Sequence, residues 1–201
     1  MAGRPRAFDR EQALRSARDA FWERGYEGTS MADLISAMNI SSASIYAAFG
    51  SKEALFREAV ADYDANDGGF ASRALTEEPT TRAALRRMLV DAVTLFTRPG
   101  KPRGCMVVLS APRCAKENEG VSDWLSVQRR ARHAAIVRRI REARDYGEIK
   151  PEADPEVLAD FYTTFLQGLS VQARDGFSKK QMMASIDSAM QVFDAVVQHP
   201  S

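Results

Sequence analysis

The chain has 201 residues, of which 45% are hydrophobic and 27% are charged, and its formal net charge is +1. This is the composition of an ordinary globular protein with enough apolar residues to bury a core. No apolar run approaches the length that spans a bilayer, and no charged-then-apolar signal segment opens the chain, so we expect a cytoplasmic protein. The near-neutral charge means that any basic surface for nucleic acid must be local.

The first segment predicts a short arm followed by a helix. Residues 3–6, with the sequence GRPR, are expected to form a flexible basic arm that holds Arg4 and Arg6. Asp9 followed by Gln12 is a capping pair for a helix that ends near Gly25. The apolar side of this helix consists of Leu14, Ala17, Phe21 and, just beyond it, Tyr26.

Residues 29–56 predict two short helices joined by a tight turn and followed at once by a third. Thr29 and Ser30 are N-cap residues, and Asp33 follows Ser30 at capping-box spacing. The sequence Asn39-Ile40-Ser41 breaks the first helix, a serine caps the second, and Ser51 caps the third. Helices this short are stable only when packed together, and such a helix-turn-helix can place its second helix in a DNA major groove.

The same residues resemble the tetracycline-repressor (TetR) family of bacterial transcription regulators. The resemblance rests on Gly25-Tyr26, Thr29-Ser30, Asn39-Ile40-Ser41, Ile45-Tyr46, Phe49-Gly50-Ser51-Lys52-Glu53 and Leu55-Phe56. It implies a homodimer with a DNA-binding domain in residues 1–55 and a ligand-binding and dimerisation domain in residues 56–201. A repressor that leaves a palindromic double-stranded DNA operator when a small molecule binds is the function we expect.

The resemblance also implies how DNA is contacted. Tyr46 would give its hydroxyl to a phosphate, and Lys52, at a helix N-terminus, would supply a second phosphate contact. The complete expected DNA-binding set is Arg4, Arg6, Thr29, Ser30, Ser42, Ala43, Ser44, Tyr46, Ala47 and Lys52. The alternatives are that Tyr46 packs in the interior, Lys52 is an ordinary surface charge and the arm is merely disordered.

Base reading is expected from the exposed positions of the second short helix, while Ile45 and Phe49 face the core. The sequence departs from the family pattern at Ser42 and Ala48, where a long basic or aromatic residue is common. Serine can bond to several bases and an alanine methyl can touch thymine, but neither makes the bidentate contact that discriminates best. Arg4 and Arg6 could compensate from the minor groove.

The rest of the chain predicts further helices and no strand, which gives an all-α fold of about nine helices. Helices are expected from about Lys52 to Asp64, over residues 85–96, from about Glu119 to Tyr146, and from Asp154-Pro155 and Ser178 onward. The breakers at 67–69 and 77–79 mark the best place for a change of domain. The helix before them is the expected lever between the two domains.

The C-terminal region supplies candidates for a ligand pocket and a dimer interface. Residues that could line an apolar cavity are Met88, Phe96, Met106, Trp124, Phe161, Phe165 and Phe177, although such stripes are more often plain core. The resemblance implies that the last two helices form the dimer interface, through Phe161, Leu169, Ile186, Met190, Phe193 and Val197. Gly168 in a helix interior suggests a close helix crossing.

The remaining reactive residues give no enzyme or metal pattern. Cys105 and Cys114 make no metal motif, and on one helix they would lie roughly 13 Å apart, too far for a mutual disulfide. They are either inert buried thiols or redox sensors. With only His133 and His199, no nucleophile–histidine–acid set is present, so we expect no cofactor and no enzyme. The rival functions are a small all-helical enzyme and a helical protein-interaction module.

Overall fold

The computed structural model describes residues 8–111 and 114–198, and over these ranges the fold is all-α. Its helices are α1 (Arg10–Arg24), α2 (Met31–Met38), α3 (Ser42–Phe49), α4 (Lys52–Ala65), α5 (Phe70–Glu77), α6 (Thr81–Phe96), α7 (Met106–Leu109), α8 (Glu119–Asp145), α9 (Pro155–Arg174) and α10 (Lys179–Asp194). Nine of these described helices have eight or more residues, which confirms the predicted fold class and helix number. A 3-10 turn, η1 (Lys116–Asn118), precedes α8.

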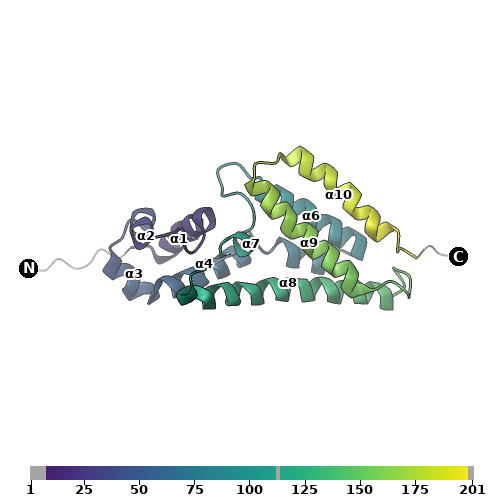
Figure 1. The fold of residues 1–201 in the computed structure, drawn as a ribbon, viewed down its shortest axis with the longest axis horizontal. Coiled ribbons are helices and arrows are strands. Elements are labelled where there is room, and N and C mark those ends of the chain that lie inside the picture. The colour runs from purple at the N-terminus through teal and green to yellow at the C-terminus, as the bar shows by residue number, and fades with distance from the viewer. Residues whose placement is uncertain (1–7, 112–113, 199–201) are drawn as a thin grey trace, which may run out of the picture.

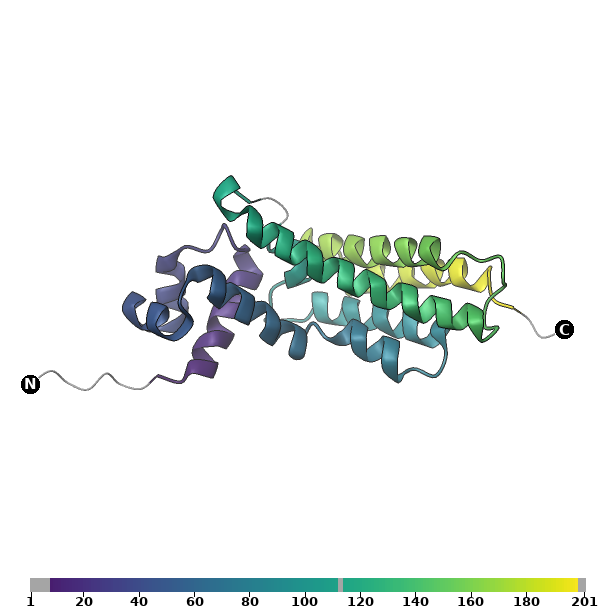
Figure 2. The same cartoon turned by 90° about the horizontal axis from the view of Figure 1, so that it is seen from below.

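The helices form a small N-terminal group and a longer helical bundle. The helices α1 to α3 gather at one end around the start of α4, and α6, α8, α9 and α10 form the elongated remainder (Figures 1 and 2). The helix α4 leads from the first group toward the second, so the expected boundary between residues 55 and 56 falls inside a continuous helix. No helix within the described ranges is long and apolar enough to cross a membrane.

Most predicted helix starts are confirmed because the capping residues bond as their spacing requires. Ser30 and Ser178 each form a complete capping box, with Asp33 and Gln181 respectively. Asp154 accepts from two backbone N–H groups at the start of α9. Local hydrogen-bonding chemistry therefore determines where these helices begin.

The helix α5 is absent from the sequence prediction, which placed breakers on both sides of it. Its first residue follows Gly69, whose position offers no side-chain cap. The buried residues of α5 are Phe70, Ala71, Ala74 and Leu75, and they pack mainly against α6. This short helix is held by tertiary packing, which a propensity argument does not detect.

The two cysteines do not share a helix, so the condition on which their separation was estimated is not met. Cys105 is the residue before the four-residue α7, and Cys114 lies beyond the end of that helix. Both thiols are free in this structure. The estimate of their separation along one helix therefore does not apply.

Residues 104–110, which we call the α7 segment, attach the larger bundle to α1. The indole Nε1 of Trp22 donates to the Gly104 carbonyl at 2.9 Å, and the Tyr26 N–H donates to the Ser110 carbonyl at 2.8 Å. Gly25 allows this approach, since a Cβ there would lie 2.8 Å from the Ser110 oxygen. The N-terminal group of helices is thus joined to the bundle by this segment as well as by α4.

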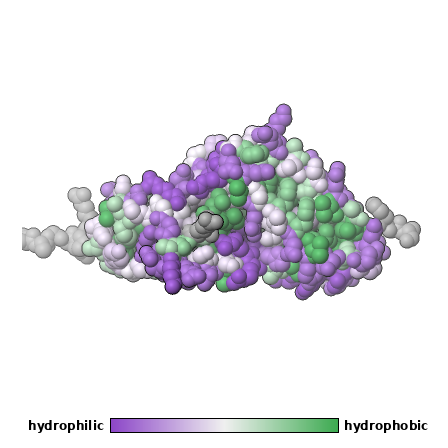
Figure 3. Space-filling view, viewed as in Figure 1, coloured by the Kyte–Doolittle hydropathy of each residue, from purple (hydrophilic) through white to green (hydrophobic). Residues whose placement is uncertain are grey.

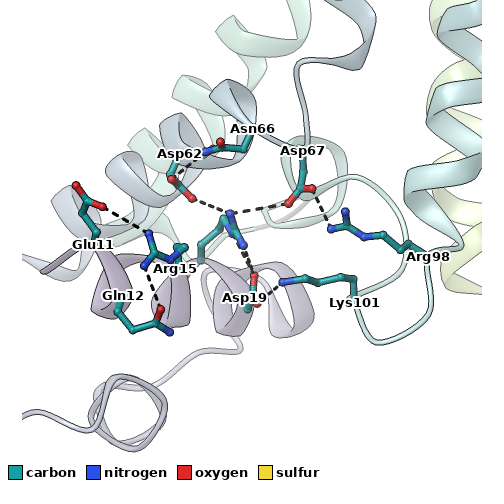
Figure 4. A network of polar contacts seen from close by, with 10 residues as sticks. Glu11, Gln12, Arg15, Asp19, Asp62, Asn66, Asp67, Arg98 and Lys101 are labelled. Atoms are coloured by element: carbon teal, nitrogen blue, oxygen red, sulfur yellow. Dashed lines mark hydrogen bonds and ion pairs between the residues drawn. The ribbon is translucent and has the colours of Figure 1, made fainter. Parts of the chain in front are cut away.

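A buried arginine strengthens the same junction (Figure 4). Only 7% of the Arg18 side chain is exposed, and its guanidinium contacts Asp62 at 2.8 Å and Asp19 at 2.9 Å. Burial acts to lower the pKa of Arg18, but the bonds and charges of Asp19, Asp62 and Asp67 outweigh it and raise that pKa. Lys101 reaches Asp19 at 2.8 Å from the far side of the junction.

Replacing Arg18 with methionine should destabilise the fold strongly. The variant keeps the length of the side chain but removes the only cation paired with the half-buried Asp62 among the described residues, so we expect a loss of about 1.5–3 kcal/mol in urea unfolding. The matched control is Arg15→Met on the same helix, whose exposed pair with Glu11 should contribute less than about 1 kcal/mol. Equal losses in the two variants would contradict a structural role for the Arg18 network.

Candidate nucleic-acid interface

The helix α2 begins at an exposed serine and a buried threonine. Ser30 is exposed, and its hydroxyl accepts from the Asp33 N–H at 3.1 Å. Thr29 has no exposed surface, and its hydroxyl donates to the Gly25 carbonyl at 2.7 Å. The prediction that the Thr29 side chain meets DNA is therefore corrected, because that side chain ties α2 to the end of α1.

The turn between α2 and α3 depends on two residues. Asn39 closes α2 with φ of 52°, a left-handed conformation that asparagine tolerates better than most side chains. Ser41 then caps α3 by accepting from the Ser44 N–H at 3.1 Å. The chain therefore reverses within a few residues and presents α3 on the surface.

The helix α3 has a buried face and an exposed face, as predicted. Ile45 is fully buried and Phe49 is 4% exposed, so this i, i+4 pair anchors the helix to the core. On the opposite face, Tyr46 is 48% exposed. The other outward positions are Ala43 and Ala47, which are exposed, and Ser42 and Ser44, which are half-buried.

Lys52 is the first residue of α4 and follows the end of α3 by three positions. Its Nζ sits 4.4 Å from the centre of the Tyr26 ring, and it has no ion pair among the described residues. Burial lowers the pKa of Lys52, while the nearby carboxylates of Glu27 and Asp33 act in the opposite direction. Its ammonium remains available to a phosphate near the N–H groups that open α4.

Other cations at this end are committed to carboxylates or lie outside the described residues. Arg10 pairs with Glu58 at 2.8 Å and stacks over the Phe49 ring, and Arg24 pairs with Asp33. Arg4 and Arg6 fall in the part of the chain that the structure leaves undescribed. The described interface thus offers one unpaired lysine, hydroxyl groups and a small-residue helix face to a polyanion.

The residues expected to line a ligand pocket do not line the four best-defined hollows among the described residues. Met88 and Met106 are fully buried and Phe96 is 1% exposed, all within the closed core. Trp124 is half-buried beside Phe56, whereas Phe161 and Phe165 stack with ring centres 6.1 Å apart on α9. Phe177 is 42% exposed beyond the end of α9.

A hollow of about 240 Å³ instead lies where α8 faces α4 and α5. It is lined by Asp64, Gly68, Gly69, Ala71, Ser72, Leu75, Gln128, Ala131, Arg132 and Ala135. The pattern of large apolar residues used in the sequence analysis missed it because its walls consist mostly of small and polar side chains.

Most of the residues expected at the dimer interface are buried inside the single chain. Leu169, Ile186, Met190 and Phe193 are each at most 2% exposed and pack in its own core. Val197 lies beyond α10 and forms an isolated antiparallel bridge with Ile149. The assignments of Leu169, Ile186, Met190 and Phe193 are corrected, whereas Phe161 and Val197 of the expected set are half-buried in the single chain.

The sequence analysis missed that α9 is apolar on two sides. One side, which includes Leu158, Tyr162, Leu166 and Leu169, is buried. The other presents Val157 and Val171, which are 63% and 46% exposed, together with Phe161 and Phe165. The signal was available, since apolar residues at 157, 161, 165 and 171 follow a second helical stripe beside the first.

Comparison with known proteins identifies the two parts of the chain. Residues 13–59 match the model of bacterial regulatory proteins of the tetR family, and residues 79–190 match the tetracyclin repressor-like C-terminal domain. The HTH-type transcriptional repressor ComR of Escherichia coli K12 is 32% identical, over 97% of this chain and 93% of its own. The repressor BdcR of the same strain is 28% identical, over 98% and 94%.

A solved structure shows that the similarity extends from the sequence to the fold. A cysteine mutant of the TetR family transcriptional regulator CifR, complexed with 26-bp double-strand operator DNA, is 44% identical with a TM-score of 0.90, covering 94% of this chain and all of its own. Two family models, curated relatives and this structure agree with the helix-turn-helix built above. The chain belongs to the tetR family of bacterial regulatory proteins and is a DNA-binding transcriptional regulator.

Proposed function

We propose that the chain is a homodimeric cytoplasmic repressor that binds a palindromic operator through α3 and leaves it when a small molecule acts on the bundle. The observation that carries this proposal is the exposed face of α3, which presents Tyr46, together with Lys52 at the start of α4, whose ammonium has no ion pair among the described residues. The repressor names of ComR and BdcR and the operator complex of CifR support it. Since these relatives are regulators, we assign it no enzymatic activity.

Phosphate binding and base reading divide between neighbouring side chains. Tyr46 and Lys52 carry a hydroxyl and an ammonium, which suit phosphate oxygens, and phosphates hold no sequence information. Ser42, Ala43, Ser44 and Ala47 form the small outward surface of α3 that we assign to the major groove. Their short side chains allow the helix backbone to approach the base edges closely, with hydroxyl groups and methyl groups as the reading elements.

The outward stripe of α9 is the surface that we assign to the dimer. Figure 3 shows hydrophobic residues gathered over the face on which α9 and α10 lie. Phe161 and Phe165 lie at its centre, between the exposed Val157 and Val171. A Cβ at Gly168 would meet nothing within the chain, so this glycine leaves room for a close approach by a second subunit rather than for a crossing within one.

Release from DNA follows from the spacing of two subunits. Two α3 helices must lie about 34–36 Å apart, or a near multiple, to enter successive major grooves of one duplex. A molecule that prefers a dimer with another spacing shifts the population, and a full reversal needs about 5.5 kcal/mol of differential binding. The hollow between α4, α5 and α8 is the place where such a molecule would act on the helix that leads to α3.

Removing a phosphate contact should weaken binding to every DNA sequence alike. We expect Lys52→Met, which keeps the stem over the Tyr26 ring, to weaken operator and random DNA equally and to reduce the salt slope by about one charge per subunit. Tyr46→Phe should weaken both without a change of slope. Fluorescence anisotropy over a salt series measures both quantities, and a change of base preference in Lys52→Met would contradict its assignment to phosphate.

Changing the outward face of α3 should instead affect the operator alone. Ala47→Leu and Ser42→Ala should cost roughly 1–3 kcal/mol per half-site on the operator, because they alter contacts to base edges, and leave random-DNA affinity nearly unchanged. Ala37→Leu, at an exposed position of α2, is the matched control. If the α3 variants matched that control on operator DNA, α3 would not be the reading helix.

Charge on the outward stripe of α9 should separate the subunits. Phe161→Glu with Phe165→Glu places carboxylates on the proposed interface, so we expect a folded monomer in sedimentation and a loss of operator binding. Tyr146→Glu, at a side chain that is 84% exposed outside this stripe, should leave the dimer intact. An unchanged dimer in the double variant would refute this interface.

A further inference from the structure

Three chemically active side chains meet in the interior where α4, α8 and the α7 segment come together. The sulfur of Cys105 lies 3.6 Å from the Tyr63 hydroxyl and 3.7 Å from Nη1 of Arg132. Cys105 and Tyr63 have no exposed surface. These groups come from positions 63, 105 and 132, so only the fold brings them together.

Packing alone does not account for this arrangement. Only 17% of the Arg132 side chain is exposed, and its nearest carboxylate, Asp64, is 3.6 Å away at the limit of an ion pair. Taking a guanidinium out of water costs several kcal/mol unless the charge is well compensated. Besides Asp64, the guanidinium faces the Phe70 ring, 5.6 Å from its centre, and the Cys105 sulfur, to which Nη1 donates. A permanent positive charge therefore lies beside the thiol.

We propose that Cys105 is a modification site at which a small hydroperoxide oxidises the thiol to a sulfenic acid. Nη1 of Arg132 donates to the sulfur, and Tyr63 donates to the oxygen that departs. The sulfur attacks one peroxide oxygen, the S–O bond forms as the O–O bond breaks, and the departing oxygen takes the Tyr63 proton. The proton released by the thiol restores Tyr63, so thiol and hydroperoxide give sulfenic acid and water or an alcohol.

Tyr63 is suited to the donor role. Burial, with the neighbouring Cys105, raises the pKa of Tyr63 well above its ordinary value, so its hydroxyl keeps its proton at neutral pH. Without that proton the departing oxygen would leave as an uncompensated anion in the interior, which is costly.

The hollow between α4, α5 and α8 provides the approach. Arg132 and Asp64 belong to its lining, so the guanidinium stands between this space and the Cys105 sulfur. A volume of about 240 Å³ admits a hydroperoxide readily. Cys105 is not among the lining residues, so a hydroperoxide reaches the sulfur when Arg132 moves aside, whereas a bulky electrophile would need the core to open.

Oxidation at this position has a direct route to the DNA-binding end. The sulfur is enclosed, so an added oxygen must displace Tyr63 or the start of the α7 segment. The Tyr63 ring packs edge-on to Trp22 with centres 4.8 Å apart, and the Trp22 indole is bonded to the Gly104 carbonyl beside Cys105. Either displacement moves α1, and the movement of α1 releases DNA. This regulation rests on the proposed function, in which a small molecule releases the protein from its operator.

The test uses the purified full-length protein, hydrogen peroxide and dimedone, a reagent that traps sulfenic acids. Peptide mapping should find dimedone on Cys105, and operator affinity should fall at least about tenfold, or about 1.4 kcal/mol, and recover with dithiothreitol. The operator affinity of Cys114→Ser should fall with peroxide as it does in the parent protein. Cys105→Ser should bind operator normally, and peroxide should leave its affinity unchanged. Trapping on Cys114 alone, or on neither cysteine, would overturn the proposal.

Variants of Arg132 and Tyr63 test whether these two neighbours activate the Cys105 thiol. Arg132→Met should slow trapping about tenfold, or about 1.4 kcal/mol in the barrier, because it removes the guanidinium that donates to the sulfur. Arg132→Lys should restore part of the rate, and Tyr63→Phe should slow it in a protein whose melting temperature is checked in parallel. Trapping rates unchanged in both Arg132→Met and Tyr63→Phe would show that these groups do not activate Cys105.

The outcome for the reduced protein distinguishes this proposal from the proposed function. If the reduced protein fails to bind operator, DNA-linked repression itself is wrong. If it binds operator but peroxide leaves that affinity unchanged in the parent protein, only the oxidation of Cys105 is refuted.

Discussion

The first helix of the DNA-binding end is held from two sides at once, and the orientation of α3 depends on this double attachment. On one side, Phe21 of α1 packs edge-on against Phe56 of α4 with ring centres 5.1 Å apart. On the other side, the Trp22 indole donates a hydrogen bond to the Gly104 carbonyl of the α7 segment. A short helix-turn-helix has too little buried surface to fix its own geometry, so it takes its position from α1.

This attachment changes how a signal in the bundle reaches DNA. The sequence favoured α4 alone as the lever, because it is the helix that runs from one domain to the next. The structure adds the α7 segment, which contacts α1 through Trp22 and Tyr26 while Arg129 of α8 donates to the Val107 carbonyl at 3.1 Å. In the proposed release from DNA, a change between α4 and α8 would therefore act on α1 through two connections, and relative motion of these connections would change the orientation of α3.

Local chemistry was predictable from the sequence and long-range placement was not. The caps at Ser30, Asp154 and Ser178 follow from side chains within three residues of each helix start, and they are confirmed. Assigning Phe193 to a dimer interface failed because a helical stripe shows which side is apolar but not whether the same chain or a partner covers it. The meeting of Tyr63 with Cys105 depends on the tertiary fold, which no local pattern encodes.

Hydrogen exchange tests the central coupling most directly, with operator DNA as the only ligand. Coupling is reciprocal, so if the α7 segment and the reading helix share one equilibrium, DNA bound at α3 must also slow exchange in the α7 segment. We predict that operator DNA protects the backbone amides of residues 104–110 as well as those of α2 and α3. Protection confined to residues 30–60, with no change in residues 104–110, would contradict the account.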